Sequence, residues 1–155
     1  RRNICVPHAR RGLAALSVYL DTSVLVPIFL LDPFVDRARA FLASKPKDII
    51  VSDFDSAEFA SVVGLRLRMK VLTAPEARTA FANFDGWVEA NALGAETVPP
   101  DIRAAGIFLR RLDLPLRAPD AIHLAIAQRL GARLATFDKR MAAAARALGI
   151  SVAAL

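Results

Sequence analysis

The chain has 155 residues, which suffice for one domain with a sizeable core, and its 55% hydrophobic content and mean hydropathy of +0.38 exclude a disordered protein. No apolar run approaches the ~20 residues of a membrane span. The single cysteine, Cys5, excludes an internal disulfide and a cysteine-based zinc site, and this low cysteine content fits a reducing cytoplasm. The net charge of +6 is weak evidence for a nucleic-acid partner, because four of the arginines lie in the first 18 residues, which contain no acid.

Residues 1–17 are predicted to be a basic N-terminal extension that is disordered or non-essential, and residues 18–155 to form a single domain. The extension is rich in arginine and is similar to a targeting peptide. A secretory signal does not fit, because its apolar part runs directly into the first predicted strand.

Strands and helices alternate after the extension. In chain order the pattern predicts a strand at 18–21, helices at 24–31 and 33–43, a strand at 49–51, helices at 52–70 and 74–90, a strand at 96–98, helices at 101–111 and 120–130, a strand at 133–137, a helix at 139–148 and a strand at 150–153. This alternation indicates an α/β fold with a mostly parallel sheet.

Several helix ends carry their own signals. Thr22 or Ser23 is expected to cap the first helix, and Asp32 the second. Capping boxes are expected where Ser52 and Thr73 precede an acid by three residues. Four further acids are expected to act as caps or loop residues: Asp53, Asp55, Asp101 and Asp113.

Four other acids should meet at one edge of the sheet. Asp21 and Asp138 end two strands, Asp120 lies in the first turn of a helix, and Glu58 lies in the second turn of another. Open parallel sheets bind ligands beyond the carboxyl ends of their strands. Because clustered carboxylates repel one another, a chain that gathers them usually binds a hard cation such as Mg²⁺. The pattern therefore predicts a metal-dependent phosphodiesterase.

Each of these acids also has an ordinary structural explanation. Asp120 could favour the helix dipole, Asp138 could be an N-cap and Asp21 could belong to a turn. Glu58 is harder to explain in this way, because its apolar neighbours predict a largely buried helix in which a carboxylate needs a partner. His123, three residues after Asp120, is expected to be a hydrogen-bonded packing residue rather than a metal ligand.

The segments that carry these acids resemble a known family. Residues 18–25, 52–63, 118–125 and 134–140 look like the four signature regions of PIN-domain ribonucleases, with VapC toxins of VapBC toxin–antitoxin systems as the closest resemblance. Asp21, Glu58, Asp120 and Asp138 match the acidic tetrad of that family. Ser23 and Thr136 match its supporting hydroxyl positions.

The resemblance implies a PIN-like three-layer α/β/α fold with a five-stranded parallel sheet in the order 3-2-1-4-5. It also implies Mg²⁺- or Mn²⁺-dependent RNA cleavage at the four carboxylates, a homodimer, and inhibition by a cognate VapB-type antitoxin that inserts a basic side chain into the acidic pocket. Arg117 and Arg140 are candidates for contacts to the RNA backbone.

Three alternatives remain open. A phosphatase of the haloacid dehalogenase type also has an acid after its first strand, but it needs a second Asp where this chain has Ser23. A receiver domain needs paired acids near the first strand, where only Asp21 stands. A non-catalytic PIN-like interaction module is the third, and the intact set of acids argues against it.

Overall fold

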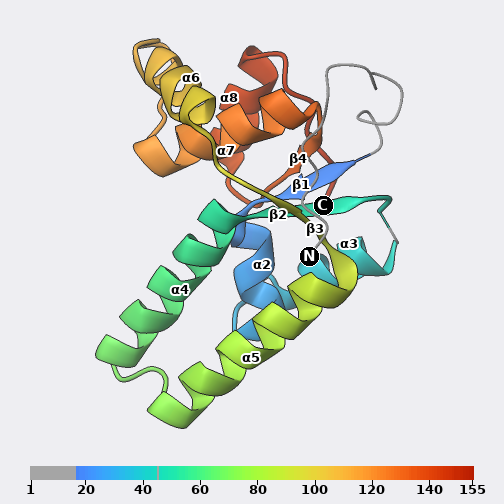
Figure 1. Cartoon of the computed structure of the whole chain (residues 1–155), viewed down its shortest axis with the longest axis vertical. Helices are drawn as coiled ribbons and strands as arrows, with labels where there is room; N and C mark the ends of the chain where they lie inside the picture. The colour runs from blue at the N-terminus through green and yellow to red at the C-terminus, as the bar shows by residue number, and fades with distance from the viewer. Residues whose placement is uncertain (1–16, 45) are drawn as a thin grey trace.

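A parallel sheet lies at the centre of the computed structural model, which describes residues 17–44 and 46–155 (Figure 1). Over these ranges the sheet has four strands in the order β3-β2-β1-β4, all paired in parallel. The strands are β1 Val18–Leu20, β2 Ile49–Ser52, β3 Leu93–Ala95 and β4 Arg133–Ala135. The helices are α2 Thr22–Phe29, α3 Val35–Ala43, α4 Asp53–Arg68, α5 Ala74–Asn91, α6 Pro99–Leu109, α7 Ala118–Leu130 and α8 Lys139–Ala147.

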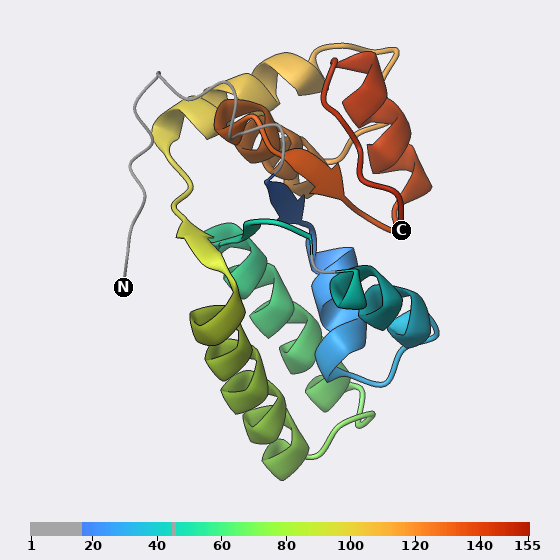
Figure 2. The ribbon, with the colours of Figure 1, turned by 90° about the vertical axis from the view of Figure 1, so that its right-hand side faces the viewer.

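The helices cover the sheet on both faces (Figures 1 and 2). Helices α2 to α5 lie on one face, where α4 and α5 form a long hairpin, and α6 to α8 lie on the other. The predicted α/β class and three-layer arrangement are therefore confirmed.

The central strand β1 is buried on both faces, which explains its continuously apolar sequence. Val18, Tyr19 and Leu20 are all 0% exposed. Val18 and Leu20 belong to the core beneath α2, α4 and α5, whereas Tyr19 belongs to the core beneath α6, α7 and α8. Side chains alternate between the faces of a strand, so each face of β1 supports a separate helical layer.

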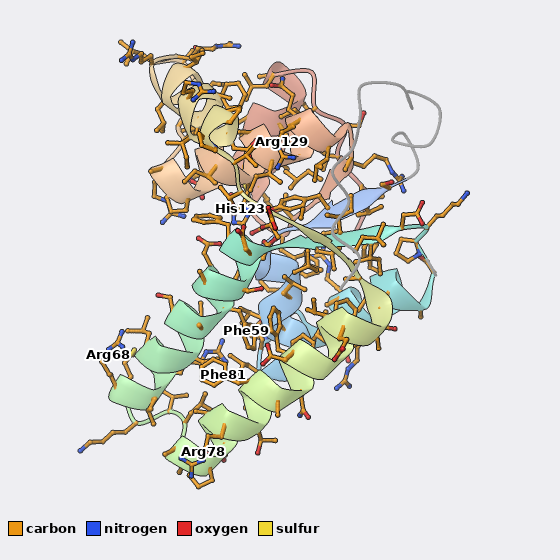
Figure 3. The ribbon with its side chains drawn as sticks, in the orientation of Figure 1. Phe59, Arg68, Arg78, Phe81, His123 and Arg129 are labelled. Carbon is orange, nitrogen blue, oxygen red and sulfur yellow. The ribbon has the colours of Figure 1, made fainter. Side chains whose placement is uncertain are left out.

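Aromatic rings hold α2, α4 and α5 together. Phe59 of α4 stacks on Phe84 of α5 with ring centroids 4.2 Å apart, and Phe29 of α2 meets both rings edge-on. Figure 3 shows Phe59 and Phe81 in the space between α4 and α5, where their centroids are 6.4 Å apart. Stacked and edge-on pairs of this kind stabilise beyond their buried area by about 0.5–1.5 kcal/mol each.

Local sequence patterns predicted several helix ends correctly. Both predicted capping boxes are present, Ser52 with Asp55 and Thr73 with Glu76. Gly131 ends α7 with a φ of 63°, a conformation that a residue without Cβ adopts without strain.

The starts of α2 and α3 differ from the prediction. Helix α2 begins at Thr22 and its N-cap is Asp21, whose side chain accepts from the backbone N–H of Ser23. Helix α3 begins at Val35 instead of residue 33, because the carboxylate of Asp32 accepts from the N–H of the next residue but one and closes a turn before the helix.

The third strand lies at Leu93–Ala95 rather than at 96–98. The predicted segment cannot continue the ladder, because side chains bind two of its backbone N–H groups, those of Thr97 and Val98. The carboxylate of Asp53 accepts from the N–H and hydroxyl of Thr97, and Asp101 accepts from the N–H of Val98. A side chain also shortens the fourth strand relative to the predicted 133–137, because Oγ of Ser23 accepts from the backbone N–H of residue 137.

The predicted fifth strand does not form within the described residues. The segment 150–153 makes a single parallel bridge, between Leu134 and Val152, so the chain runs beside β4 without a full ladder. The order of the four observed strands, 3-2-1-4, agrees with the prediction. The predicted number of five strands is wrong, because the last segment does not form a strand.

The predicted extension, residues 1–17, lies outside the described residues except for Ser17. The carbonyl of Ser17 already accepts from the N–H of Arg133 in β4. That the extension is separable from the domain stays a prediction. Among the helices of the described ranges, none is both long and apolar enough to span a membrane.

Candidate active site

The site is built at the carboxyl ends of β1 and β4, the two adjacent strands at the centre of the sheet. Asp21 directly follows β1 and is only 4% exposed. Its carboxylate accepts from the hydroxyl of Ser23 at 2.6 Å and from the hydroxyl of Thr136 at 2.5 Å. Two hydroxyls from elements 113 residues apart therefore hold one carboxylate in place.

Glu58 reaches the same place from α4. Its carboxylate accepts from the hydroxyl of Thr22 at 2.7 Å and lies 2.6 Å from Nε2 of His123. The Glu58 side chain is 27% exposed, so it is paired and still open to the pocket.

Asp120 and Asp138 each stabilise the start of a helix, Asp138 as the N-cap of α8 and Asp120 from the first turn of α7. Asp120 accepts from the backbone N–H of Arg117 at the start of α7, and Asp138 accepts from the N–H groups of Arg140 and Met141 at the start of α8. All of these bonds go to one oxygen of each carboxylate, Oδ2 of Asp120 and Oδ1 of Asp138. The caps thus leave a second oxygen of each acid for another ligand.

One pocket of about 250 Å³ brings these residues together. Its lining comprises Asp21, Thr22, Ser23, Glu58, Ser61, Val62, Arg117, Asp120, His123, Asp138 and Met141. All four acids singled out in the sequence are among them. The tightest group is smaller: single ligand atoms of Asp21, Glu58 and His123 lie within 4.8 Å of one another.

His123 is a lining residue of this pocket and lies near the start of α4 (Figure 3). The imidazole is 2% exposed, and its two nitrogens contact Glu58 through Nε2 and the hydroxyl of Tyr19 through Nδ1 at 2.8 Å. Burial lowers the pKa of His123, but the bond to Glu58 and the charges of Asp55 and Asp21 outweigh it and raise the pKa to about 9. The expected hydrogen bonds and burial of this histidine are confirmed, and that it is not a metal ligand stays a prediction.

A protonated His123 orders a buried chain of hydrogen bonds. Both ring nitrogens then donate, Nε2 to Glu58 and Nδ1 to Tyr19. Tyr19 donates in turn to Oγ of Ser52, whose hydroxyl donates to Asp55 at 2.6 Å. Burial raises the pKa of Tyr19 well above 10, which keeps its proton in place.

Asp55 was predicted only as a helix cap, and the structure shows a second role. It is 0% exposed and lies 3.5 Å from Nδ1 of His123. Burial raises the pKa of Asp55 to about 6, against the opposing charge of His123. The pKa of Glu58 is shifted in the opposite direction. Burial would raise it, but the hydrogen bond and the charge of His123 hold it below the usual range. The spacing of Asp55 and Glu58, three residues on one helix, could have signalled that both face His123.

A basic pocket of about 380 Å³ adjoins the acidic one. Its lining includes the cationic side chains of Arg117, Lys139 and Arg140, and it shares Asp120 and Asp138 with the acidic pocket. The two arginines singled out in the sequence therefore lie beside the acids. Lys139 was missed, although its place directly after Asp138 could have indicated it.

The donor set suits a hard divalent cation. Carboxylate oxygens are the ligands that Mg²⁺ and Mn²⁺ prefer, and Asp21, Glu58, Asp120 and Asp138 supply them around one small pocket. The raised pKa of His123 reflects the same excess of negative charge, because the imidazolium is held by acids on two sides.

Comparison with known proteins agrees with this geometry. A sequence model of the PIN domain family matches residues 18–147. The chain is 34% identical over 142 residues to Ribonuclease VapC46 of Mycobacterium tuberculosis, an alignment that covers 89% of this chain and 97% of that protein.

Solved structures of similar fold include two bacterial proteins. The first is Mycobacterium tuberculosis VapC20, described as a Sarcin-Ricin loop cleaving toxin, with a TM-score of 0.67, 21% identity and coverage of 82% of this chain and 94% of that one. The second is FitAcB from Neisseria gonorrhoeae, with a TM-score of 0.67, 20% identity and coverage of 87% and 95%. On the fold, the family match and the similarity to a VapC protein over 89% of the sequence, the chain belongs to the PIN domain family and is a relative of its VapC ribonuclease toxins.

Proposed function

We propose that the protein is a Mg²⁺- or Mn²⁺-dependent endoribonuclease that acts as the toxin of a type II toxin–antitoxin system. The observation that carries this proposal is the convergence of four carboxylates, from four separate elements, on one pocket. A relative at 34% identity over almost the whole chain is a ribonuclease of the VapC group, which supports RNA as the substrate.

In this proposal Asp21, Glu58, Asp120 and Asp138 hold the metal. The bound ion supplies charge neutralisation of the scissile phosphate and a more acidic water. Ser23 and Thr136 fix the orientation of Asp21 through their hydroxyls.

The remaining residues position the acids and the RNA. His123 donates to Glu58 and keeps that carboxylate ionised, as the lowered pKa of Glu58 indicates. A free carboxylate oxygen of the set can accept a proton from the attacking water. Arg117 and Arg140, together with Lys139, would contact the phosphates on either side of the cleaved bond from the basic pocket.

Cleavage of a structured RNA with and without EDTA tests the assignment. We expect activity that needs Mg²⁺ or Mn²⁺ and that Asp21→Asn and Asp120→Asn each abolish. Asp113→Asn is the matched control, because that acid is exposed and pairs with Arg111 away from the pocket lining. Full activity in both pocket variants would show that the site lies elsewhere.

We also propose a cognate VapB-type antitoxin and a homodimer as the protein's partners, because the chain belongs with the VapC toxins. The antitoxin would insert a basic side chain between the four acids. Sedimentation at tens of micromolar should give the mass of a dimer, and a stable monomer would contradict this part of the proposal. The cytoplasm, expected from the sequence as the place of action, stays a prediction.

A further inference from the structure

Two phenylalanines from distant elements form a stacked aromatic pair, which we name the aromatic shelf. Phe34 lies in the turn before α3, and Phe137 follows β4. Their rings stack with centroids 4.9 Å apart and planes inclined by 16°. Phe34 is 41% exposed, whereas Phe137 is half-buried and packs against the core beneath α2, α4 and α5.

The shelf borders the acidic pocket. Both rings line an adjoining pocket of about 370 Å³, and this pocket shares Thr22, Ser23 and Asp138 with the acidic one. Phe137 directly precedes Asp138, and its backbone N–H donates to Oγ of Ser23 at 2.9 Å. The hydroxyl of Ser23 also donates to Asp21, so one side chain ties the shelf to the acids.

A cation supports the shelf from the side of α3. The guanidinium of Arg37 lies 5.6 Å from the ring centroid of Phe34 and 5.0 Å from that of Phe137. Its Nη2 donates to the carbonyl of Leu155, which fixes the side chain against the rings. Arg37 does not line the adjoining pocket, whose charged lining residues are Asp32 and Asp138, so this pocket suits a neutral planar group and not a phosphate.

A base of single-stranded RNA has this chemistry. Sequence-tolerant RNA binding uses aromatic and guanidinium planes on which bases stack, next to basic grooves that follow the phosphates. Here the basic pocket with Arg117 and the shelf lie against the same acidic pocket, and Asp138 lines all three. RNA whose scissile phosphate sits at the acids can therefore place phosphates in the basic pocket and a neighbouring base on the shelf.

We infer that the Phe34–Phe137 shelf is a base-stacking subsite, which holds one base next to the scissile phosphate of the RNA substrate. This inference rests on the proposed ribonuclease function. The main rival occupant is an aliphatic side chain of a protein partner, which needs an apolar surface but no aromatic plane.

Binding of two decamers separates these occupants. The probes are a (CA)5 RNA and an abasic ribose-phosphate decamer, measured on Asp120→Asn protein so that the RNA stays intact. Phe34→Ala should weaken binding of (CA)5 by about 5- to 150-fold and leave binding of the abasic decamer unchanged. Phe34→Trp should retain the affinity for (CA)5, because it keeps an aromatic plane. Phe34→Leu should weaken binding of (CA)5 as much as Phe34→Ala, because it removes that plane.

Ile107→Ala is the control, because Ile107 is an exposed apolar residue of α6. The inference is overturned if Phe34→Leu binds (CA)5 as well as the parent does, if Phe34→Ala weakens both decamers equally, or if the parent shows no preference for (CA)5. Cleavage by the protein with Asp120 intact is measured separately. If the protein with Asp120 intact cleaves no RNA, the proposed ribonuclease function is wrong. The comparison of the two decamers would then still show whether the shelf binds a base.

Discussion

Nε2 of His123 lies 2.6 Å from Oε2 of Glu58, and this contact connects the buried core to the open pocket. His123 is 2% exposed, whereas the Glu58 side chain is 27% exposed. An imidazolium buried between acids stabilises them when no metal is bound, because it supplies the positive charge that the cluster lacks. His123 is thus a positioning residue whose charge should affect both stability and metal binding.

The stability of the metal-free protein should fall between pH 6.5 and pH 9. Folding raises the pKa of His123 from 6.5 to about 9, so its stabilising contribution is complete below pH 6.5 and is lost as the pH rises through 9. By linkage the contribution is on the order of 3 kcal/mol. Urea unfolding in EDTA at pH 6 and pH 9 measures it. Glu58→Gln should reduce the difference between the two pH values, and an undiminished difference would assign it to another group.

Mg²⁺ should raise the melting temperature more at pH 7.5 than at pH 5. Burial, with a smaller contribution from the charge of Asp21, raises the pKa of Asp55 from 3.8 to about 6, so this group destabilises the fold as the pH rises from 3.8 through 6. At pH 7.5 the ionised Asp55 adds a repelling negative charge behind the acidic pocket. The cation relieves the repulsion by binding the folded state and competing with protons. Differential scanning fluorimetry with millimolar Mg²⁺ measures the shift.

Asp21→Asn should greatly reduce that Mg²⁺ shift, because it removes a ligand together with a repelling charge. Asp113→Asn, at an exposed site, should leave it unchanged. Equal shifts at both pH values, or a full shift in Asp21→Asn, would mean that the acids do not form a single cation site.

Thr136→Val should weaken metal binding without removing a ligand. The hydroxyl of Thr136 donates to Asp21 and accepts from the N–H of Asp138, so it positions two acids at once. Loss of such a supporting bond typically lowers metal affinity by about 10- to 100-fold. The Mg²⁺ concentration for half-maximal cleavage should rise accordingly, while Thr79→Val, at an exposed helical position, should leave it unchanged. An unaltered Mg²⁺ requirement in Thr136→Val would rule out this positioning role.

Arg117→Ala and Arg140→Ala should each make RNA binding less sensitive to salt. Each phosphate contact to single-stranded nucleic acid contributes about 0.7 to the slope of log affinity against log salt. Fluorescence anisotropy with (CA)5 RNA over a range of KCl concentrations measures that slope. Arg78→Ala is the control, because Arg78 lies near the start of α5, far from His123 (Figure 3). An identical loss of slope in all three variants would indicate general charge attraction instead of the basic pocket.

The sequence by itself determined the fold class, the two capping boxes and the acids of the pocket. These features are local: a buried parallel strand is apolar throughout, a capping box spans four residues, and an acid that directly follows a strand must lie at its carboxyl end. Asp21 and Asp138 could therefore be assigned to one edge of the sheet before any contact was known.

The tertiary structure alone decided the contacts between distant elements. The hydrogen bond from Thr97 to Asp53 keeps the backbone N–H of Thr97 out of the sheet, where the third strand was expected. The bond between His123 and Glu58 joins residues 65 positions apart. The stack of Phe34 on Phe137 likewise depends on where α3 and β4 meet. Local patterns encode which residues are apolar or can form caps. Which distant side chain binds a given backbone donor or ring depends on the packing of the helices around the sheet, which is a property of the whole chain.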